Sequence, residues 1–209
     1  MSGLATLVAD IREDLNRGTD FDSRIKKAIQ KAIEFYRARR YGFNQKRKDF
    51  SISTEFASLT ANWLEVDTLH LDTTSGIQVL EETNFQILFE NSNGRASGFT
   101  NRPYKYAIQN RLLRFDNPPD QTYSAHMSYL YDLTNISVCA SDSASNAWTV
   151  EGKELIQTHA SIDVLENYIE GEEAAGKALI LRQREIQVEK EMKRRANREQ
   201  GAGRVSPWF

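Results

Sequence analysis

Near the start of the chain, apolar residues recur every three or four positions, which is the spacing of one face of an α-helix. The first apolar stripe consists of Leu4, Leu7, Val8, Ile11 and Leu15. It predicts a helix over 3–16, and we expect Gly18 to end that helix because glycine readily adopts a left-handed conformation. The second stripe consists of Ile25, Ala28, Ile29, Ala32, Ile33 and Tyr36. It predicts a helix over 23–41, so the chain opens with a helical hairpin.

In the middle of the chain, apolar and polar positions alternate with the period of a β-strand, which predicts an antiparallel sheet over about 49–131. The alternation changes parity between Val66 and Leu69, and this change predicts a β-bulge between the two residues. Turn-forming residues at 72–76 predict a hairpin. The strands within 104–131 are expected to form a three-stranded antiparallel meander.

Helical spacing returns in the last third of the chain. A helix that Thr149 can cap is expected over 151–170, where apolar residues are frequent enough for a core helix. Another helix is expected over 172–198, but its apolar positions become sparse after Leu181 and charge pairs replace them. Each such pair contributes only about 0.2–0.5 kcal/mol, so we expect this half of the helix to need a packing partner.

These segments predict an α+β fold. An N-terminal helical hairpin and C-terminal helices pack with an antiparallel β-sheet that contains the meander, and an extended C-terminal arm follows. A short helix is also expected over 82–90. We divide the chain into a core over 1–170 and a C-terminal helix with a docking arm over 171–209.

The composition is that of a globular protein, since 40% of the 209 residues are hydrophobic and 27% are charged. This length suffices for one sizeable core with an appended extension. No apolar run approaches the roughly 20 residues of a membrane-spanning helix, so no membrane association is expected. The N-terminus lacks the basic region of a signal peptide, and the single Cys139 forms no internal disulfide. The single cysteine suits a reducing cytoplasm.

The net charge of −2 conceals a segregation of charge along the chain. Residues 24–48 contain ten Lys or Arg and the single acid Glu34, whereas residues 49–170 contain 17 acidic and 6 basic residues. The densest basic group consists of Arg37, Arg39, Arg40, Lys46, Arg47 and Lys48. This group predicts a solvated surface, contacts between subunits of complementary charge, or a DNA-facing surface, and the pattern alone does not choose among them.

The chain carries no recognisable catalytic or metal-binding motif. Its three histidines, His70, His126 and His159, lie far apart, and no His or Cys spacing matches a metal site. Cys139 has no basic neighbour that would lower the pKa of its thiol. We therefore expect no enzymatic activity, no metal and no cofactor, and we expect structural roles for the histidines.

Tyrosines are frequent in the predicted strands, and five of them are Tyr104, Tyr106, Tyr123, Tyr129 and Tyr131. Aromatic side chains on a sheet beside basic residues can stack on single-stranded bases. The same alternation is typical of any half-buried sheet, because aromatic residues pack well across strands. Packing in a core or an interface is therefore the favoured interpretation.

The C-terminal end contains two large aromatic residues, Trp208 and Phe209, which are costly to leave in water. Gly201 and Gly203 provide a hinge before them, and Pro207 stiffens the segment. Two hypotheses follow. The segment folds back onto its own core, or it is an arm that docks on another subunit or another protein.

The serial order of these segments resembles the head-to-tail adaptor (connector) proteins of tailed bacteriophages, especially the podovirus-like ones. The resemblance is carried by the opening stretch Leu4–Asn16, the helix Ile25–Tyr36, the passage Arg39–Thr54 from helix into sheet, and the strands within Pro103–Tyr131. The closing helices and the segment Gly203–Phe209 match the general layout of that family.

The resemblance implies a structural virion protein that joins the portal to the tail. Such adaptors form a ring, typically dodecameric, that extends the channel for double-stranded DNA and offers a lower surface to a tail or nozzle protein. The implied location is the neck of the virion, after assembly in the host cytoplasm. The implied portal-docking residues of the C-terminal arm are Arg204, Val205, Pro207, Trp208 and Phe209.

An alternative is a nucleic-acid-binding or regulatory module that uses the basic segment 24–48. Such a module predicts affinity for free duplex DNA that falls steeply with salt concentration. An adaptor predicts little such affinity as a monomer, because only the assembled ring surrounds DNA.

Overall fold

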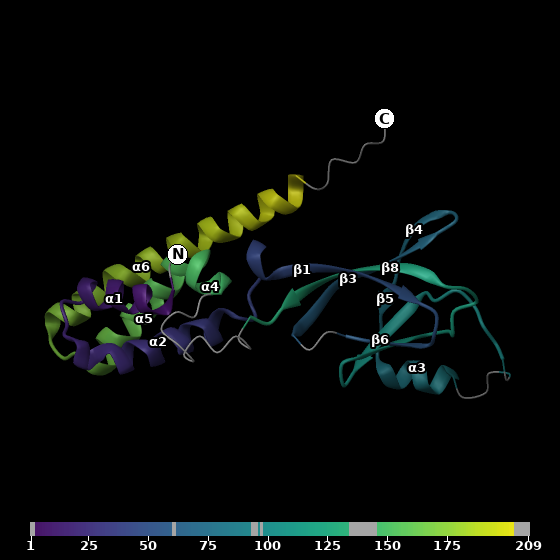
Figure 1. Ribbon diagram of the computed structural model, residues 1–209, viewed down its shortest axis with the longest axis horizontal. Helices are drawn as coiled ribbons and strands as arrows, with labels where there is room; N and C mark the ends of the chain where they lie inside the picture. Colours follow the sequence, from purple (N-terminus) through teal and green to yellow (C-terminus); the bar gives the residue numbers. More distant parts are fainter. Residues whose placement is uncertain (1–2, 60–61, 93–95, 97, 134–145, 203–209) are drawn as a thin grey trace. The chain divides into compact units, whose positions relative to one another are not determined.

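The computed structural model describes residues 3–59, 62–92, 96, 98–133 and 146–202, and of residues 199–202 it describes only the backbone. The chain folds as two compact units (Figure 1). The helical unit comprises the chain up to Asn44 and from Asp132 onward, and the strand unit comprises Gln45–Tyr131. The predicted α+β class is confirmed.

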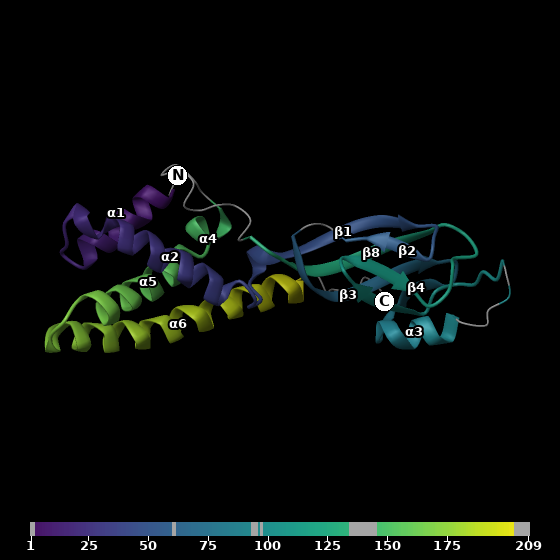
Figure 2. The same ribbon diagram turned by 90° about the horizontal axis from the view of Figure 1, so that it is seen from below.

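The helical unit is built on the two apolar stripes that the sequence shows. Its helices are α1 (Leu4–Asp14), α2 (Asp22–Tyr36), α4 (Ala147–Val150), α5 (Lys153–Tyr168) and α6 (Glu172–Ala202), with short 3₁₀ helices η1 (Thr19–Phe21) and η2 (Gly42–Asn44). Helix α5 lies between α2 and α6 (Figure 2) and contacts both. Both stripes are buried, which confirms the predicted hairpin. No helix in the described ranges is long and apolar enough to cross a membrane.

Helix α1 ends differently from the prediction, which assigned its C-terminal stop to Gly18. Asn16 adopts the left-handed conformation with φ 51°, whereas Gly18 is extended with φ −85°. The N–H groups of Asn16 and Arg17 donate to the carbonyl oxygens of Glu13 and Arg12 at 2.9 and 3.0 Å. This pair of bonds is a Schellman motif, in which asparagine replaces the usual glycine.

Helix α2 ends at Tyr36 rather than near residue 41. The buried side chain of Asn44 accepts a hydrogen bond from the N–H of Tyr41 at 2.8 Å and donates one to the carbonyl of Arg39 at 2.7 Å. These bonds satisfy backbone groups that a longer helix would otherwise pair, so a turn follows the helix.

The C-terminal helices confirm the predicted helix over 172–198 and correct one cap. Asn146 and Thr149 form a capping box at the start of α4, so Thr149 is not the N-cap of the longer helix. Helix α6 packs through small buried residues, including Ala174, Ala178 and Ala196. Because alanine contributes little to an apolar pattern, this packing face was easily overlooked in the sequence.

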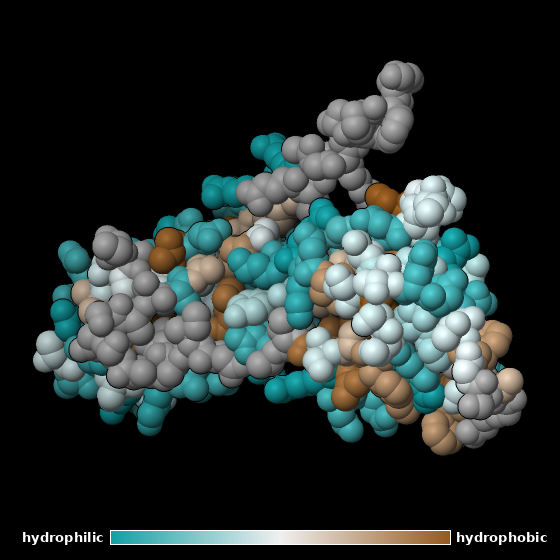
Figure 3. Space-filling model, turned by 45° about the vertical axis from the view of Figure 1, so that its right-hand side comes forward, coloured by the Kyte–Doolittle hydropathy of each residue, from teal (hydrophilic) through white to brown (hydrophobic). Residues whose placement is uncertain are grey.

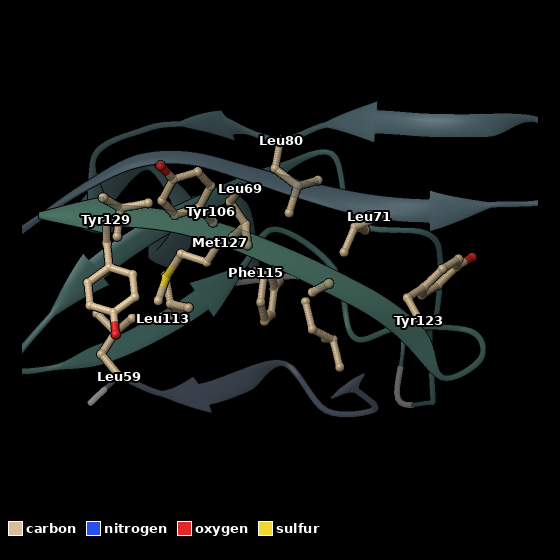
Figure 4. Packing of buried hydrophobic residues seen from close by; sticks show 13 residues of the cluster. Leu59, Leu69, Leu71, Leu80, Tyr106, Leu113, Phe115, Tyr123, Met127 and Tyr129 are labelled. Atoms are coloured by element: carbon tan, nitrogen blue, oxygen red, sulfur yellow. The ribbon is translucent and has the colours of Figure 1, made fainter. Parts of the chain in front are cut away.

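In the part of the chain that the structure describes, the strand unit forms two four-stranded sheets. Its strands are β1 (Gln45–Ile52), β2 (Phe56–Ser58), β3 (Trp63–Thr73), β4 (Gly76–Val79), β5 (Glu81–Glu82), β6 (Lys105–Gln109), β7 (Leu112–Phe115) and β8 (Tyr123–Tyr131). One sheet has the order β1-β8-β3-β4 and the other β2-β7-β6-β5. Side chains from both sheets form one core (Figure 4), in which Leu69, Leu71, Phe115 and Met127 are fully buried.

The strand pairing confirms two predictions and corrects one. The register of β3 against β8 shifts between Val66 and Thr68, which is the predicted bulge, and β3 and β4 form the predicted hairpin. The three-stranded meander is wrong. Strands β6 and β7 pair with each other, but β8 joins the other sheet between β1 and β3, where Gln45 pairs with Leu130. Alternation shows that a segment is a strand but does not identify its neighbours.

The short helix expected over 82–90 is α3 (Phe85–Ser92), and the side chain of Asn84 accepts a hydrogen bond from the N–H of Gln86 at 2.8 Å. The proposed division into a core over 1–170 and a helix with docking arm over 171–209 stays a prediction. It depends on what the arm binds, and residues 203–209 lie outside the described residues.

Candidate functional site

The six basic residues singled out in the sequence are divided between the two units. Arg37, Arg39 and Arg40 lie in the turn after α2, whereas Lys46, Arg47 and Lys48 lie in β1. The structure thus separates them into two groups with different surroundings.

Arg39 is bound within its own chain to helix α6. Its Nη1 lies 2.6 Å from Oε1 of Glu189, and its guanidinium group lies over the rings of Phe35 and Tyr36 at 4.5 and 4.8 Å. Glu189 also binds Lys193, one turn further along α6, at 2.7 Å. Burial raises the pKa of the Glu189 carboxyl, but hydrogen bonds from Lys193 and Arg39 outweigh it and lower that pKa overall. Arg39 therefore holds the middle of α6 against the end of α2.

Glu185 makes a second attachment one turn earlier on α6. The hydroxyl of Tyr36 donates a hydrogen bond to Oε1 of Glu185, and Nδ1 of His159 on α5 lies 2.5 Å from the same oxygen. Burial raises the pKa of the Tyr36 hydroxyl, and the bond to Glu185 raises it further. Burial also opposes ionisation of Glu185, but its bonds to His159 and Tyr36 lower its pKa overall. One carboxylate thus joins α2, α5 and α6.

An open depression of about 520 Å³ lies where α5 ends and α6 begins. Leu165, Ile169 and Ala178 contribute apolar walls, and the ion pair between Glu166 and Arg182 lies in its lining. Leu179 also lines it and is well exposed. This region of the helical unit exposes apolar surface that a neighbouring protein can cover.

In the strand unit, His126 lies between two carboxylates from the strands on either side of β8. Its Nδ1 lies 2.7 Å from Oδ1 of Asp49 on β1, and its Nε2 lies 2.8 Å from Oδ2 of Asp72 on β3. Arg47 donates to Oδ1 of Asp49 at 3.0 Å. The hydrogen bonds to Asp49 and Asp72 raise the pKa of His126, and the bond from His126 lowers the pKa of Asp49. This cluster ties three strands together.

Helix α3 covers the outer face of β7 through an aromatic cluster around Arg114. The guanidinium group of Arg114 lies between 5.4 and 5.6 Å from the rings of Phe56, Phe85 and Phe89, and it binds Glu55 at 2.9 Å. Phe56 and Phe89 are half-exposed. Figure 3 shows brown, apolar surface on the lower part of the strand unit, where α3 lies.

The tyrosines of the strands mainly pack in the core. Tyr106, Tyr123 and Tyr129 are buried among the core residues (Figure 4), and Tyr131, which is partly buried, packs against the same core. This confirms the packing interpretation for these four. Tyr104 is the exception, since it is 46% exposed and lies outside the core cluster. The guanidinium carbon of Arg102 lies 5.1 Å from the centre of its ring.

No group of three His, Cys, Asp or Glu residues within the described ranges can hold a metal ion. Cys139 and the five arm residues that are predicted to dock on the portal lie outside the described residues. The attachments made by Glu185 and Glu189 were missed in the sequence, because the charges in this half of the helix were considered only as pairs along the helix itself. The i,i+4 spacing of these two acids, which places them on one helix face, was the available signal.

A family model described as SU10 adaptor protein matches residues 2–206. Among curated proteins, none matches the chain.

Proposed function

Because the chain belongs to the SU10 adaptor protein family, and is thus a structural adaptor of a bacteriophage, we propose that it forms a ring that joins the portal to the tail. The ring continues the DNA channel, and the C-terminal arm docks on the portal. The family match over nearly the whole chain is the observation that carries this proposal. A dodecamer in the neck of the virion, assembled in the host cytoplasm, is the expected form.

The length of α6 supports an arm that binds far from the N-terminal end of this helix. Helix α6 has 31 residues, which corresponds to a length of about 46 Å. Glu185 and Glu189 attach its middle to α2 and α5, and the helix continues from there to Ala202. The arm with Trp208 and Phe209 follows directly.

The arm is also short relative to its distance from the apolar depression of its own subunit. The seven residues from 203 to 209 span at most about 25 Å when fully extended. The residues of α6 that line the depression run from Ala174 to Arg182, and even Arg182 lies about 30 Å from Ala202 along the helix. This difference favours a binding site for Trp208 and Phe209 other than that depression, and the portal is the partner that we propose.

The test is a variant that lacks residues 203–209, mixed with purified portal rings of the same phage. We expect its thermal unfolding to match that of the full chain and its sedimentation with portal rings to be lost. The matched control is Ser206→Ala, which keeps the aromatic pair and should bind as the full chain does. Portal binding by the truncated chain at full strength would contradict the role of the arm.

A further inference from the structure

The strand unit has two lateral edges, and the topology shows which strands form each. The outermost strands are β1 and β4 in one sheet and β2 and β5 in the other. Strand β1 leads to β2 through three residues, and β4 leads to β5 through Leu80 alone. Strands β1 and β2 therefore form one edge, called here the β1 edge, and strands β4 and β5 form the opposite one, called the β5 edge.

The β1 edge is basic. Lys46 and Arg47 are exposed, and Lys48 is partly exposed, with its ammonium group 5.6 Å from the ring of Phe50. The acid of this strand, Asp49, is already bound by Arg47 and His126. Lysine on an edge strand disfavours pairing with an arbitrary second sheet.

The β5 edge is acidic and apolar. Strand β5 consists of Glu81 and Glu82, and both are exposed. Their contacts inside the unit are long, since Glu81 lies 3.4 Å from Lys105 and Glu82 accepts a hydrogen bond of 3.3 Å from Tyr106. Beside them, Ile77 and Val79 of β4 are 73% and 63% exposed.

We propose that the β1 edge of one copy binds the β5 edge of the next copy in the ring. This inference rests on the proposed function, because it requires a ring of identical subunits. Contact between two different surfaces of one protein repeats head to tail and closes when the rotation between copies divides a full turn. The edge that carries Lys46 and Lys48 then lies beside the neighbour's edge that carries Glu81 and Glu82, and opposite charges select this pairing over contact between like edges.

Two charge-reversed variants test this pairing. One carries Lys46→Glu and Lys48→Glu, and the other carries Glu81→Lys and Glu82→Lys. In each variant the two edges have the same sign, so we expect at least a tenfold loss of rings in sedimentation and electron-microscopic imaging with purified portal rings. Far-ultraviolet circular dichroism and thermal unfolding of each variant establish that it is folded.

Mixing is the decisive step. In an equimolar mixture, the acidic β1 edge of the first variant meets the basic β5 edge of the second, and the remaining contact keeps its native signs. We therefore expect rings to return in the mixture, and also in a single chain that carries all four substitutions. Local damage to an edge or loss of a DNA contact would not be repaired in this way.

The outcomes separate the two proposals. If each variant alone forms as many rings as the unaltered chain, the edge pairing is overturned but the proposal that the chain forms a ring still stands. Loss in both variants without recovery in the mixture would also overturn the pairing. Failure of the unaltered chain to assemble with portal rings would overturn the proposed function, and the pairing with it.

Discussion

At the scale of single residues, His126 has the most distinctive surroundings. Both of its ring nitrogens lie within hydrogen-bond distance of a carboxylate, and only the doubly protonated ring can donate to both Asp49 and Asp72. Arg47 is the nearby cation: it donates to the same oxygen of Asp49, and its Nη2 lies 3.0 Å from Nδ1 of His126, where its charge opposes protonation of the ring. The hydrogen bonds to the two carboxylates outweigh this opposition, so the pKa of His126 is raised overall.

The raised pKa of His126 gives the stability of the strand unit a dependence on pH. A group whose pKa is higher in the folded state stabilises the fold fully below its unfolded pKa of about 6.5, and this contribution is lost as pH rises through the folded value. We expect thermal unfolding of the chain to occur at a lower temperature at pH 8.5 than at pH 6, with part of that difference absent in His126→Gln.

Nuclear magnetic resonance titration of His126 measures the shift directly. In Asp72→Asn the pKa of His126 should fall toward its ordinary value, because one of the two anionic acceptors is gone. A titration midpoint at or below 6.5 in the unaltered chain would contradict the proposed role of the two carboxylates.

Sequence reasoning predicted a structural role for His126 but not its partners. Asp49 and Asp72 are separated from it by 77 and 54 positions, and only the pairing of β8 with β1 and β3 brings them together. That pairing is a long-range property which local alternation does not contain. Core tyrosines such as Tyr106 were predictable, because burial follows from the alternation itself.

At the scale of elements, α6 shows why a charged helix is more stable than its pattern suggests. The sequence predicted the helix itself and the weakness of its second half in isolation. The structure supplies partners within the chain: Glu185 binds Tyr36 and His159, and Glu189 binds Arg39. These contacts depend on where α2 and α5 lie, so they were not predictable from the spacing of charges along α6.

Replacement of Glu185 by alanine should destabilise the helical unit by about 1–3 kcal/mol, which is the usual effect of removing a hydrogen-bonded charged partner. Urea-induced unfolding measures this change. Glu191→Ala is the matched control, because Glu191 is exposed on the same helix. Its effect should stay within about 0.5 kcal/mol, and equal effects of the two substitutions would show that the attachment contributes nothing.

The ends of helices were the least predictable part of the elements. Asn16 rather than Gly18 adopts the left-handed conformation, and Asn44 stabilises the turn that follows α2. Both choices depend on hydrogen bonds to particular backbone groups several residues away. Apolar spacing gives the location of a helix but carries little information about such bonds.

At the scale of the whole molecule, the strand unit has its own core and its own complete pairing of strands. We expect a fragment of residues 45–131 to fold alone and to unfold cooperatively in circular dichroism and urea titration. The matched control is residues 45–122, which lacks β8, the strand between β1 and β3. This shorter fragment should remain unfolded, and an unfolded 45–131 fragment would contradict the independence of the unit.

The pairing of Gln45 with Leu130 has a consequence for how this architecture changes over time. The chain enters the strand unit at Gln45 and leaves it after Tyr131, and these two points are neighbours because Gln45 pairs with Leu130. The strand unit is therefore a cassette inserted into the helical unit through two adjacent junctions. A cassette of this kind can be grafted between relatives without rerouting the remainder. Chimaeras of two family members, joined at these two junctions, would therefore exchange the binding specificity of the strand unit and preserve that of the helical unit.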